Sequence, residues 1–188
     1  MEILNLNNKP MLQITTREDL GKLFESVNQT GTCVEVGVQL GWNTKRIIDG
    51  GWTGVVFCVD NWVRMYELES AKKLLADYPV DFIQADSALA ASKFADGSID
   101  CVYIDADHSY EGIKRDFEAW YPKVRSGGIV SGHDYGANND CPGVKQFIDE
   151  YMAAHPEIKM YFTTDDFYHG PDKNIDGNEY QTWHFVKP

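Results

Sequence analysis

Nearly continuous apolar runs alternate with segments of helical periodicity along most of the chain. The apolar runs predict five strands, at residues 32–38, 54–60, 80–86, 99–105 and 127–134. The periodic segments predict helices at 17–28, 42–49, 65–77, 87–93, 110–124 and 143–154. Strands that are apolar on both faces are typical of a parallel sheet covered by helices. The pattern therefore predicts an α/β fold with a doubly wound sheet.

The end of the chain has a different pattern. Two more strand-like runs, 158–164 and 180–188, flank a polar stretch and predict a closing hairpin with an antiparallel edge. The connection 163–180 is long for an ordinary loop, which is typical of a lid or of a disordered segment. No repeat or linker divides the chain, so we expect one domain over 1–188 with a helical extension at 1–30.

Composition narrows the classes of partner. With 17 basic and 29 acidic residues the net charge is −12, which argues against nucleic acid and against an anionic membrane surface. No run approaches the roughly 20 apolar residues of a membrane span, and the amino terminus lacks the pattern of a secretory signal. Cys33, Cys58 and Cys101 lie in apolar runs without a C-x-x-C pair. We expect a cytoplasmic protein, and the sequence leaves open whether it forms a homo-oligomer.

The first strand ends in an E-x-G-x-x-x-G turn formed by Glu35, Gly37 and Gly41. The glycines permit a tight turn and close approach of a ligand, or they serve geometry alone. The spacing differs from the G-x-G-x-x-G of dinucleotide-binding folds, and no cation stands nearby for a pyrophosphate. The carboxylate of Glu35 would repel phosphate and favour an ammonium or sulfonium ligand.

Acidic residues also end the next two strands. Asp60 is placed to accept hydrogen bonds from both ribose hydroxyls, and Trp62 to pack on an adenine ring; a helix cap and a core position are the alternatives. Asp86 either accepts the adenine amino group or caps the following helix. Three acidic strand ends in register favour a ligand site.

With these residues placed, the chain resembles the class I S-adenosylmethionine-dependent methyltransferases from about Gly31 to the C-terminus. The matching motifs are the glycine turn, VDNW, QADS, YIDADHSYEG and GGIVSGHDYG. DADHSY and GHDY are most similar to the small-molecule and sugar O-methyltransferase branch. The resemblance implies a Rossmann-like seven-stranded sheet, mostly parallel, with an antiparallel C-terminal strand. Gln39 departs from the pattern, because many relatives have glycine there.

The resemblance also implies how the cofactor is held. Glu35, Gly37 and Gly41 would hold the methionine end, Asp60 the ribose, and Asp86 with Ser87 the adenine. Three neighbours complete the expected cofactor site: Asn61, Trp62 and Asp105.

The predicted reaction centre lies at the ends of the fourth and fifth strands. Methyl transfer needs an aligned acceptor oxygen and a group that removes its proton, which suits a histidine. The candidates are His108, Asp107 and His133, and we favour His108 because related sugar O-methyltransferases carry their base on this segment. Catechol and macrolide-sugar relatives imply a divalent metal, magnesium or manganese, on Asp105, His133 and Asp134; imidazole suits manganese better than magnesium.

The sequence therefore predicts S-adenosylmethionine-dependent methyl transfer to a hydroxyl of a small acceptor, such as a sugar or a phenol. A nicotinamide-dependent dehydrogenase is an alternative, disfavoured by the glycine spacing. A non-catalytic S-adenosylmethionine-binding module is another, disfavoured by the intact polar residues of the fourth and fifth strands.

Overall fold

The computed structural model describes residues 13–28, 30–136, 142–164 and 180–188. The described strands join one seven-stranded sheet in the order β3-β2-β1-β4-β5-β7-β6. They are β1 Thr32–Val36, β2 Val55–Asp60, β3 Val80–Gln84, β4 Ile99–Ile104, β5 Val124–Tyr135, β6 Tyr161–Phe162 and β7 Gln181–Val186. β1 to β5 pair in parallel, whereas β7 lies antiparallel between β5 and β6. The predicted fold class is confirmed.

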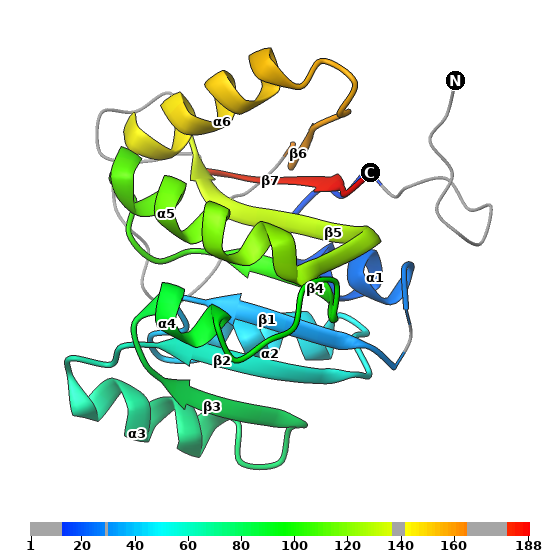
Figure 1. Cartoon of the computed structure of the whole chain (residues 1–188). Coiled ribbons are helices and arrows are strands. Elements are labelled where there is room, and N and C mark those ends of the chain that lie inside the picture. Colours follow the sequence, from blue (N-terminus) through cyan, green and yellow to red (C-terminus); the bar gives the residue numbers. More distant parts are fainter. Residues whose placement is uncertain (1–12, 29, 137–141, 165–179) are drawn as a thin grey trace.

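Helices cover both faces of this sheet (Figure 1). One face carries α1 (Leu20–Glu25), α2 (Trp42–Asp49) and α3 (Met65–Leu74); the other carries α4 (Ser87–Ala91), α5 (Tyr110–Trp120) and α6 (Pro142–Ala154). Two short 3-10 helices, η1 (Arg17–Asp19) and η2 (Tyr121–Lys123), precede α1 and follow α5. A buried apolar cluster lies under each layer, which explains why the strands are apolar on both sides.

The junction between α5 and β5 differs from the prediction. The helix ends at Trp120, because Pro122 opens the 3-10 turn η2. β5 begins at Val124 instead of residue 127, and a register shift lets Ile99 pair with Val124 while Cys101 pairs with Ile129. Gly128 allows this bulge, because a Cβ there would lie 2.5 Å from the carbonyl oxygen of Asp100.

The structure describes only part of the segments predicted near the two ends of the chain. The leading helix is shorter than predicted, and a capping box between Thr16 and Asp19 begins it. Most of the predicted lid, residues 165–179, lies outside the described residues. In the part of the chain that the structure describes, no helix has the length and apolar character needed to cross a membrane.

Candidate active site at the carboxyl ends of the strands

The parallel strands end at one edge of the sheet, and the predicted site residues lie there. In strand order they are Glu35 and Gly37 at β1, Asp60 at β2, Asp86 after β3, Asp105 after β4 and Asp134 near the end of β5. Ligands of doubly wound sheets bind outside the carboxyl ends of the strands. The edge is therefore the candidate site.

The turn after β1 needs its two glycines for different reasons. Gly37 has φ 90°, and a Cβ there would lie 1.9 Å from the carbonyl oxygen of Asp105. Gly41 has φ 85° and is the N-cap of α2. Gly37 thus lets β1 approach the end of β4, and Gly41 turns the chain into α2.

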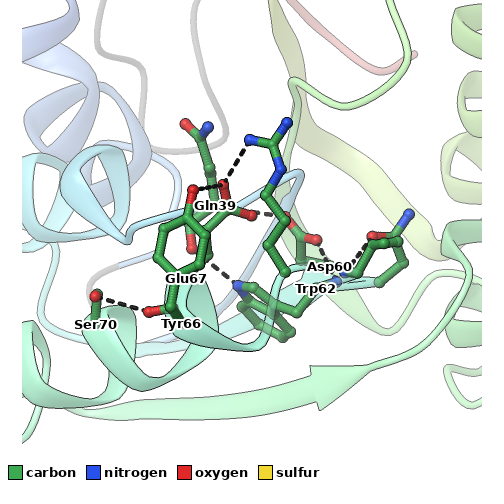
Figure 2. A network of polar contacts seen from close by, with 9 residues as sticks. Gln39, Asp60, Trp62, Tyr66, Glu67 and Ser70 are labelled. Atoms are coloured by element: carbon green, nitrogen blue, oxygen red, sulfur yellow. Dashed lines mark hydrogen bonds and ion pairs between the residues drawn. The ribbon is translucent and has the colours of Figure 1, made fainter.

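Asp60 and Trp62 hold Gln39 in its left-handed conformation (Figure 2). The N–H of Gln39 donates to Asp60 Oδ2 at 2.9 Å, and its carbonyl accepts from Trp62 Nε1 at 2.9 Å. The other carboxylate oxygen of Asp60 accepts from the N–H of Trp62 at 2.7 Å. These bonds explain how a residue other than glycine keeps φ 50° here. Both oxygens of Asp60 retain a lone pair for a ligand.

Trp62 does not have the position that adenine stacking needs. It is 1% exposed, and its ring packs against Phe82 with 5.8 Å between the centroids. The stacking prediction is therefore wrong, and the core alternative describes Trp62.

Further contacts hold the loop between β2 and α3. Asn61 is exposed, and its Oδ1 accepts from the N–H of Val63 at 3.2 Å. Glu67, 8% exposed, accepts from Arg64 at 3.3 Å and from the Tyr66 hydroxyl at 3.4 Å (Figure 2). The loop that carries Asp60 and Asn61 is therefore shaped before any ligand binds.

Glu35 lies beneath the turn and is 1% exposed. It accepts hydrogen bonds from Asn43 Nδ2 at 3.1 Å and from the hydroxyl of Thr44. Burial raises the pKa of Glu35 to about 7, although these two hydrogen bonds act in the opposite direction. The predicted direct contact with the methionine end does not fit this placement, because the carboxylate is covered and bound to α2.

Asp86 and Ser87, the predicted adenine contacts, both have structural partners. Asp86 Oδ1 accepts from the N–H of Ala88 at 3.0 Å and caps α4, which confirms the capping alternative. The Ser87 hydroxyl accepts from Trp120 Nε1 at 2.9 Å. Asp86 Oδ2 lies 3.5 Å from Arg115, and the Asp86 side chain is 45% exposed. The cap uses Oδ1, so Oδ2 is the oxygen of Asp86 that is left for another partner.

Asp107 lies two residues before Ser109, the N-cap of α5. Its Oδ1 accepts from the N–H of Ser109 at 3.0 Å, and this bond lowers the pKa of Asp107. A Cβ on Gly112 would lie 2.3 Å from its carboxyl carbon, so the carboxylate packs on the helix. Asp107 therefore holds the residue that caps α5, and its lowered pKa makes it a weaker candidate for the base.

Asp134 joins two imidazoles where β4 and β5 end. His108 Nε2 lies 2.9 Å from Asp134 Oδ2 and 3.4 Å from Asp105 Oδ1. His133 Nδ1 lies 3.3 Å from the other oxygen of Asp134. Asp134 is 6% exposed and has φ 60°, a conformation that non-glycine residues adopt mainly where the surroundings impose it.

His108 is charged in this arrangement. Its contacts with Asp105 and Asp134 raise the pKa of His108 to about 11. Burial acts to raise the pKa of Asp134, but the contacts with His108 and His133 outweigh it and hold this pKa well below its usual range. An imidazolium has no lone pair for a proton. The prediction that His108 is the base therefore does not hold for this arrangement.

The ring of His133 is placed differently. Its Nε2 is buried and has no hydrogen-bond partner among the described residues. With a hydrogen on Nδ1 facing Asp134, the lone pair of the ring is on Nε2. In a general-base dyad, a carboxylate contacts one ring nitrogen of a histidine and leaves the other to accept a proton. Asp134 and His133 have this arrangement.

The candidate metal ligands are Asp105, His108 and Asp134, whose ligand atoms lie within 4.8 Å of one another. The predicted set contained His133 in the place of His108, and that part is corrected because His133 faces the opposite oxygen of Asp134. Two carboxylates with one imidazole suit manganese, iron, nickel or zinc better than magnesium.

The sequence analysis missed Asn43. This residue lies two positions after Gly41, and its Oδ1 is buried with no partner among the described residues. Its place directly after the glycine turn was the available signal, but the buried oxygen is visible only in three dimensions.

The sheet order, with β7 inserted antiparallel, and the polar edge define a class I S-adenosylmethionine-dependent methyltransferase. A family model described as a methyltransferase domain matches residues 34–135, more than half of the chain. The chain belongs to this methyltransferase family. A protein of Sinorhizobium fredii (strain NBRC 101917 / NGR234) is 26% identical over 142 residues, 68% of this chain. The match spans only 16% of that relative's length.

Solved structures share the fold. The O-methyltransferase TomG of Streptomyces achromogenes, in complex with S-adenosylmethionine, has a TM-score of 0.67 at 16% identity, over 92% of this chain and 79% of TomG. An S-adenosylmethionine-dependent O-methyltransferase of Thermotoga maritima has a TM-score of 0.62 at 13% identity, over 94% and 67%. An rRNA methylase of Streptococcus thermophilus has a TM-score of 0.63 at 13% identity, over 90% and 93%.

Proposed function

We propose that the chain transfers a methyl group from S-adenosylmethionine to a hydroxyl of a small acceptor. The observation that carries this proposal is the His133–Asp134 pair at the same edge as the glycine turn, in which His133 Nε2 has no hydrogen-bond partner among the described residues. Membership of the methyltransferase family supports the cofactor.

The chemistry asks two things of the protein. S-adenosylmethionine supplies an electrophilic methyl group when bound. The chain must align the acceptor oxygen with that methyl and remove its proton. His133 Nε2 takes the hydroxyl proton, and Asp134 holds the ring in the required tautomer and stabilises the imidazolium that forms.

Two carboxylates and the turn hold the cofactor in this proposal. The open lone pairs of Asp60 accept from the ribose hydroxyls, and Asp86 Oδ2 accepts from the adenine amino group. Gly37 and Gly41 let the backbone approach the methionine end. The ribose contact is supported by the placement of Asp60, because the N–H groups of Trp62 and Gln39 hold its two oxygens in position without the cofactor.

A divalent metal on Asp105, His108 and Asp134 is part of the proposal. The donor set fits a transition metal, which requires His108 to bind as neutral imidazole. Such an ion would position and polarise the acceptor oxygen when bound. His133 stays outside the ligand set, because its Nδ1 faces the other oxygen of Asp134.

The acceptor we propose is a sugar or a phenol-like compound. A net charge of −12 disfavours a polyanion such as RNA, although one similar fold belongs to an rRNA methylase. We place the protein in the cytoplasm, which the buried free thiols of Cys33, Cys58 and Cys101 favour.

The test is turnover with labelled S-adenosylmethionine and a panel of hydroxylated small molecules. His133→Ala is expected to lower kcat by about 10²–10⁴-fold with an unchanged Kd for S-adenosylhomocysteine. Excess manganese is expected to restore part of the activity of His108→Ala but none of that of His133→Ala. Lys123→Gln, which breaks the surface ion pair with Asp96, is the control.

Three outcomes would contradict the proposal. Normal turnover of His133→Ala would remove the base assignment. Binding of S-adenosylhomocysteine without methyl transfer to any acceptor would favour a binding module. Binding of NAD in its place would favour a dehydrogenase.

A further inference from the structure

A groove runs along an outer face of α2. It has a volume of about 470 Å³, which is within the range of small-molecule sites. Four of its lining residues stand at i, i+3, i+4 and i+7 on one face of α2, and the others come from η1, α1 and the C-cap of α2. The lining residues are Glu18, Lys22, Trp42, Lys45, Arg46, Asp49 and Gly50. None of them belongs to the proposed cofactor, metal or base site.

Backbone contacts hold the walls of the groove together. A Cβ on Gly21 of α1 would lie 2.1 Å from the carbonyl oxygen of Ile47 in α2. A Cβ on Gly50 would lie 2.7 Å from the carbonyl oxygen of Glu18. Glycine at both positions lets the backbones meet, so the wall that carries Lys22 has a fixed place beside α2.

The two carboxylates of the groove are paired with cations of the groove itself. Glu18 Oε1 accepts from Arg46 Nε at 2.9 Å, and Asp49 Oδ2 accepts from Lys45. The other oxygen of Asp49 accepts from the Tyr78 hydroxyl at 3.1 Å. These pairs balance the charges of both carboxylates inside the groove.

Lys22 is the cation that remains. Its ion pair with Asp19 Oδ1 is 3.9 Å long, which exceeds a hydrogen bond, and its side chain is 65% exposed. The other oxygen of Asp19 accepts from the N–H of Thr15 at 3.3 Å, at the start of η1. The groove thus has one more positive than negative lining residue in a chain of net charge −12, and this local excess favours an anion.

Trp42 adds an apolar surface to the same groove. It is 52% exposed, whereas the other four tryptophans of the chain are at most 1% exposed. Those four are Trp52, Trp62, Trp120 and Trp183. An exposed indole offers a flat face on which another ring can stack. The groove is therefore complementary to a ligand that has both an aromatic ring and an acidic group.

We propose that this groove binds a small aromatic anion, whose ring stacks on Trp42 and whose carboxylate or phosphate group is bound by Lys22. Lys45, one turn after Trp42, adds positive charge to the same face of α2. The ligand is distinct from S-adenosylmethionine, because the groove extends to Asp49 and Gly50, at the opposite end of α2 from the glycine turn. This inference does not depend on the proposed function.

The experiment measures binding of three naphthalene compounds by calorimetry, with and without saturating S-adenosylhomocysteine. 2-Naphthoate and 2-naphthyl phosphate carry the two acidic groups, and 2-naphthamide is their neutral counterpart. We expect at least one anion to bind about tenfold more tightly than the amide, because a hydrogen bond to a charged group is gained. The preferred anion distinguishes a carboxylate ligand from a phosphate ligand.

Two variants assign the contacts. Lys22→Gln is expected to weaken the preferred anion about tenfold and to leave the amide unchanged. Trp42→Ala is expected to weaken all compounds about two- to tenfold, because the stacked ring is lost. Lys123→Gln is the matched control, since it removes one positive charge outside the groove, and we expect it to bind as the wild type does. Melting temperatures report the folding of each variant.

Nuclear magnetic resonance locates the ligand independently. The indole N–H signal that Trp42→Ala removes should shift when the anion is added to the wild type. Absence of binding by both anions would overturn the proposal, as would equal affinity for the amide or unchanged affinity of Lys22→Gln. Displacement of the anion by S-adenosylhomocysteine would also overturn it, because the compound would then occupy the cofactor site.

Discussion

Asp60 has two roles in this account, and a pair of variants separates them. Asp60→Ala removes the acceptor for the N–H groups of Gln39 and Trp62, at 2.9 and 2.7 Å, as well as the ribose contact. A hydrogen bond to a charged group contributes about 1.5–3 kcal/mol. Loss of the ribose contact alone therefore raises the Kd for S-adenosylhomocysteine by roughly 10–150-fold.

Trp62→Phe isolates the structural role. It removes the donation from Trp62 Nε1 to the carbonyl of Gln39 at 2.9 Å, but it keeps Asp60 and most of the packing on Phe82. We expect a loss of about 1 kcal/mol of stability and a Kd within about threefold of the wild type. Calorimetry and thermal melting of both variants give the answer. Equal loss of affinity in the two would show that Asp60 acts only through the turn.

Three further predictions concern the metal, the glycine turn and the fold. Excess chelator is expected to abolish turnover, and manganese to restore it at least as well as magnesium; full activity in chelator would contradict the metal site. Gly37→Ala is expected to unfold the chain or lower its melting temperature strongly, because the Cβ would lie 1.9 Å from the Asp105 carbonyl oxygen at φ 90°. Burial lowers the pKa of His184 from 6.5 to about 4. The unfolded chain therefore binds a proton first as pH falls, and stability is lost between these values, by about 3 kcal/mol in all. In urea unfolding from pH 7.5 to 4.5, His184→Phe should lose less stability than the wild type, and parallel curves would refute this.

The fold could be predicted because its main evidence is local. Apolar runs and periodic segments located the strands and helices, and the two runs after α6 predicted the antiparallel addition of β7. The boundaries that were missed depend on long-range pairing. The early start of β5 at Val124 follows from the bulge opposite Asp100, which no local pattern reveals.

The site could be predicted only as a set of residues at one edge. Strand ends located Asp60, Asp105 and Asp134, because the carboxyl ends of parallel strands meet. The role of each residue depends on the direction of its side chain, which the sequence does not give. Sequence cannot show that His108 lies between two carboxylates, or that a ring nitrogen of His133 has no partner in the described part of the chain. Both facts depend on how the residues after β4 and at the end of β5 lie against each other in three dimensions.

The position of the cofactor sulfur tests the central claim most directly. A crystal structure with S-adenosylhomocysteine would give the distances from this sulfur to the ring nitrogens of His133 and His108. The account predicts His133 Nε2 at roughly 6–7 Å from the sulfur, with room for a methyl group and an acceptor oxygen between them. A sulfur that faces His108, or that lies away from both histidines, would contradict it.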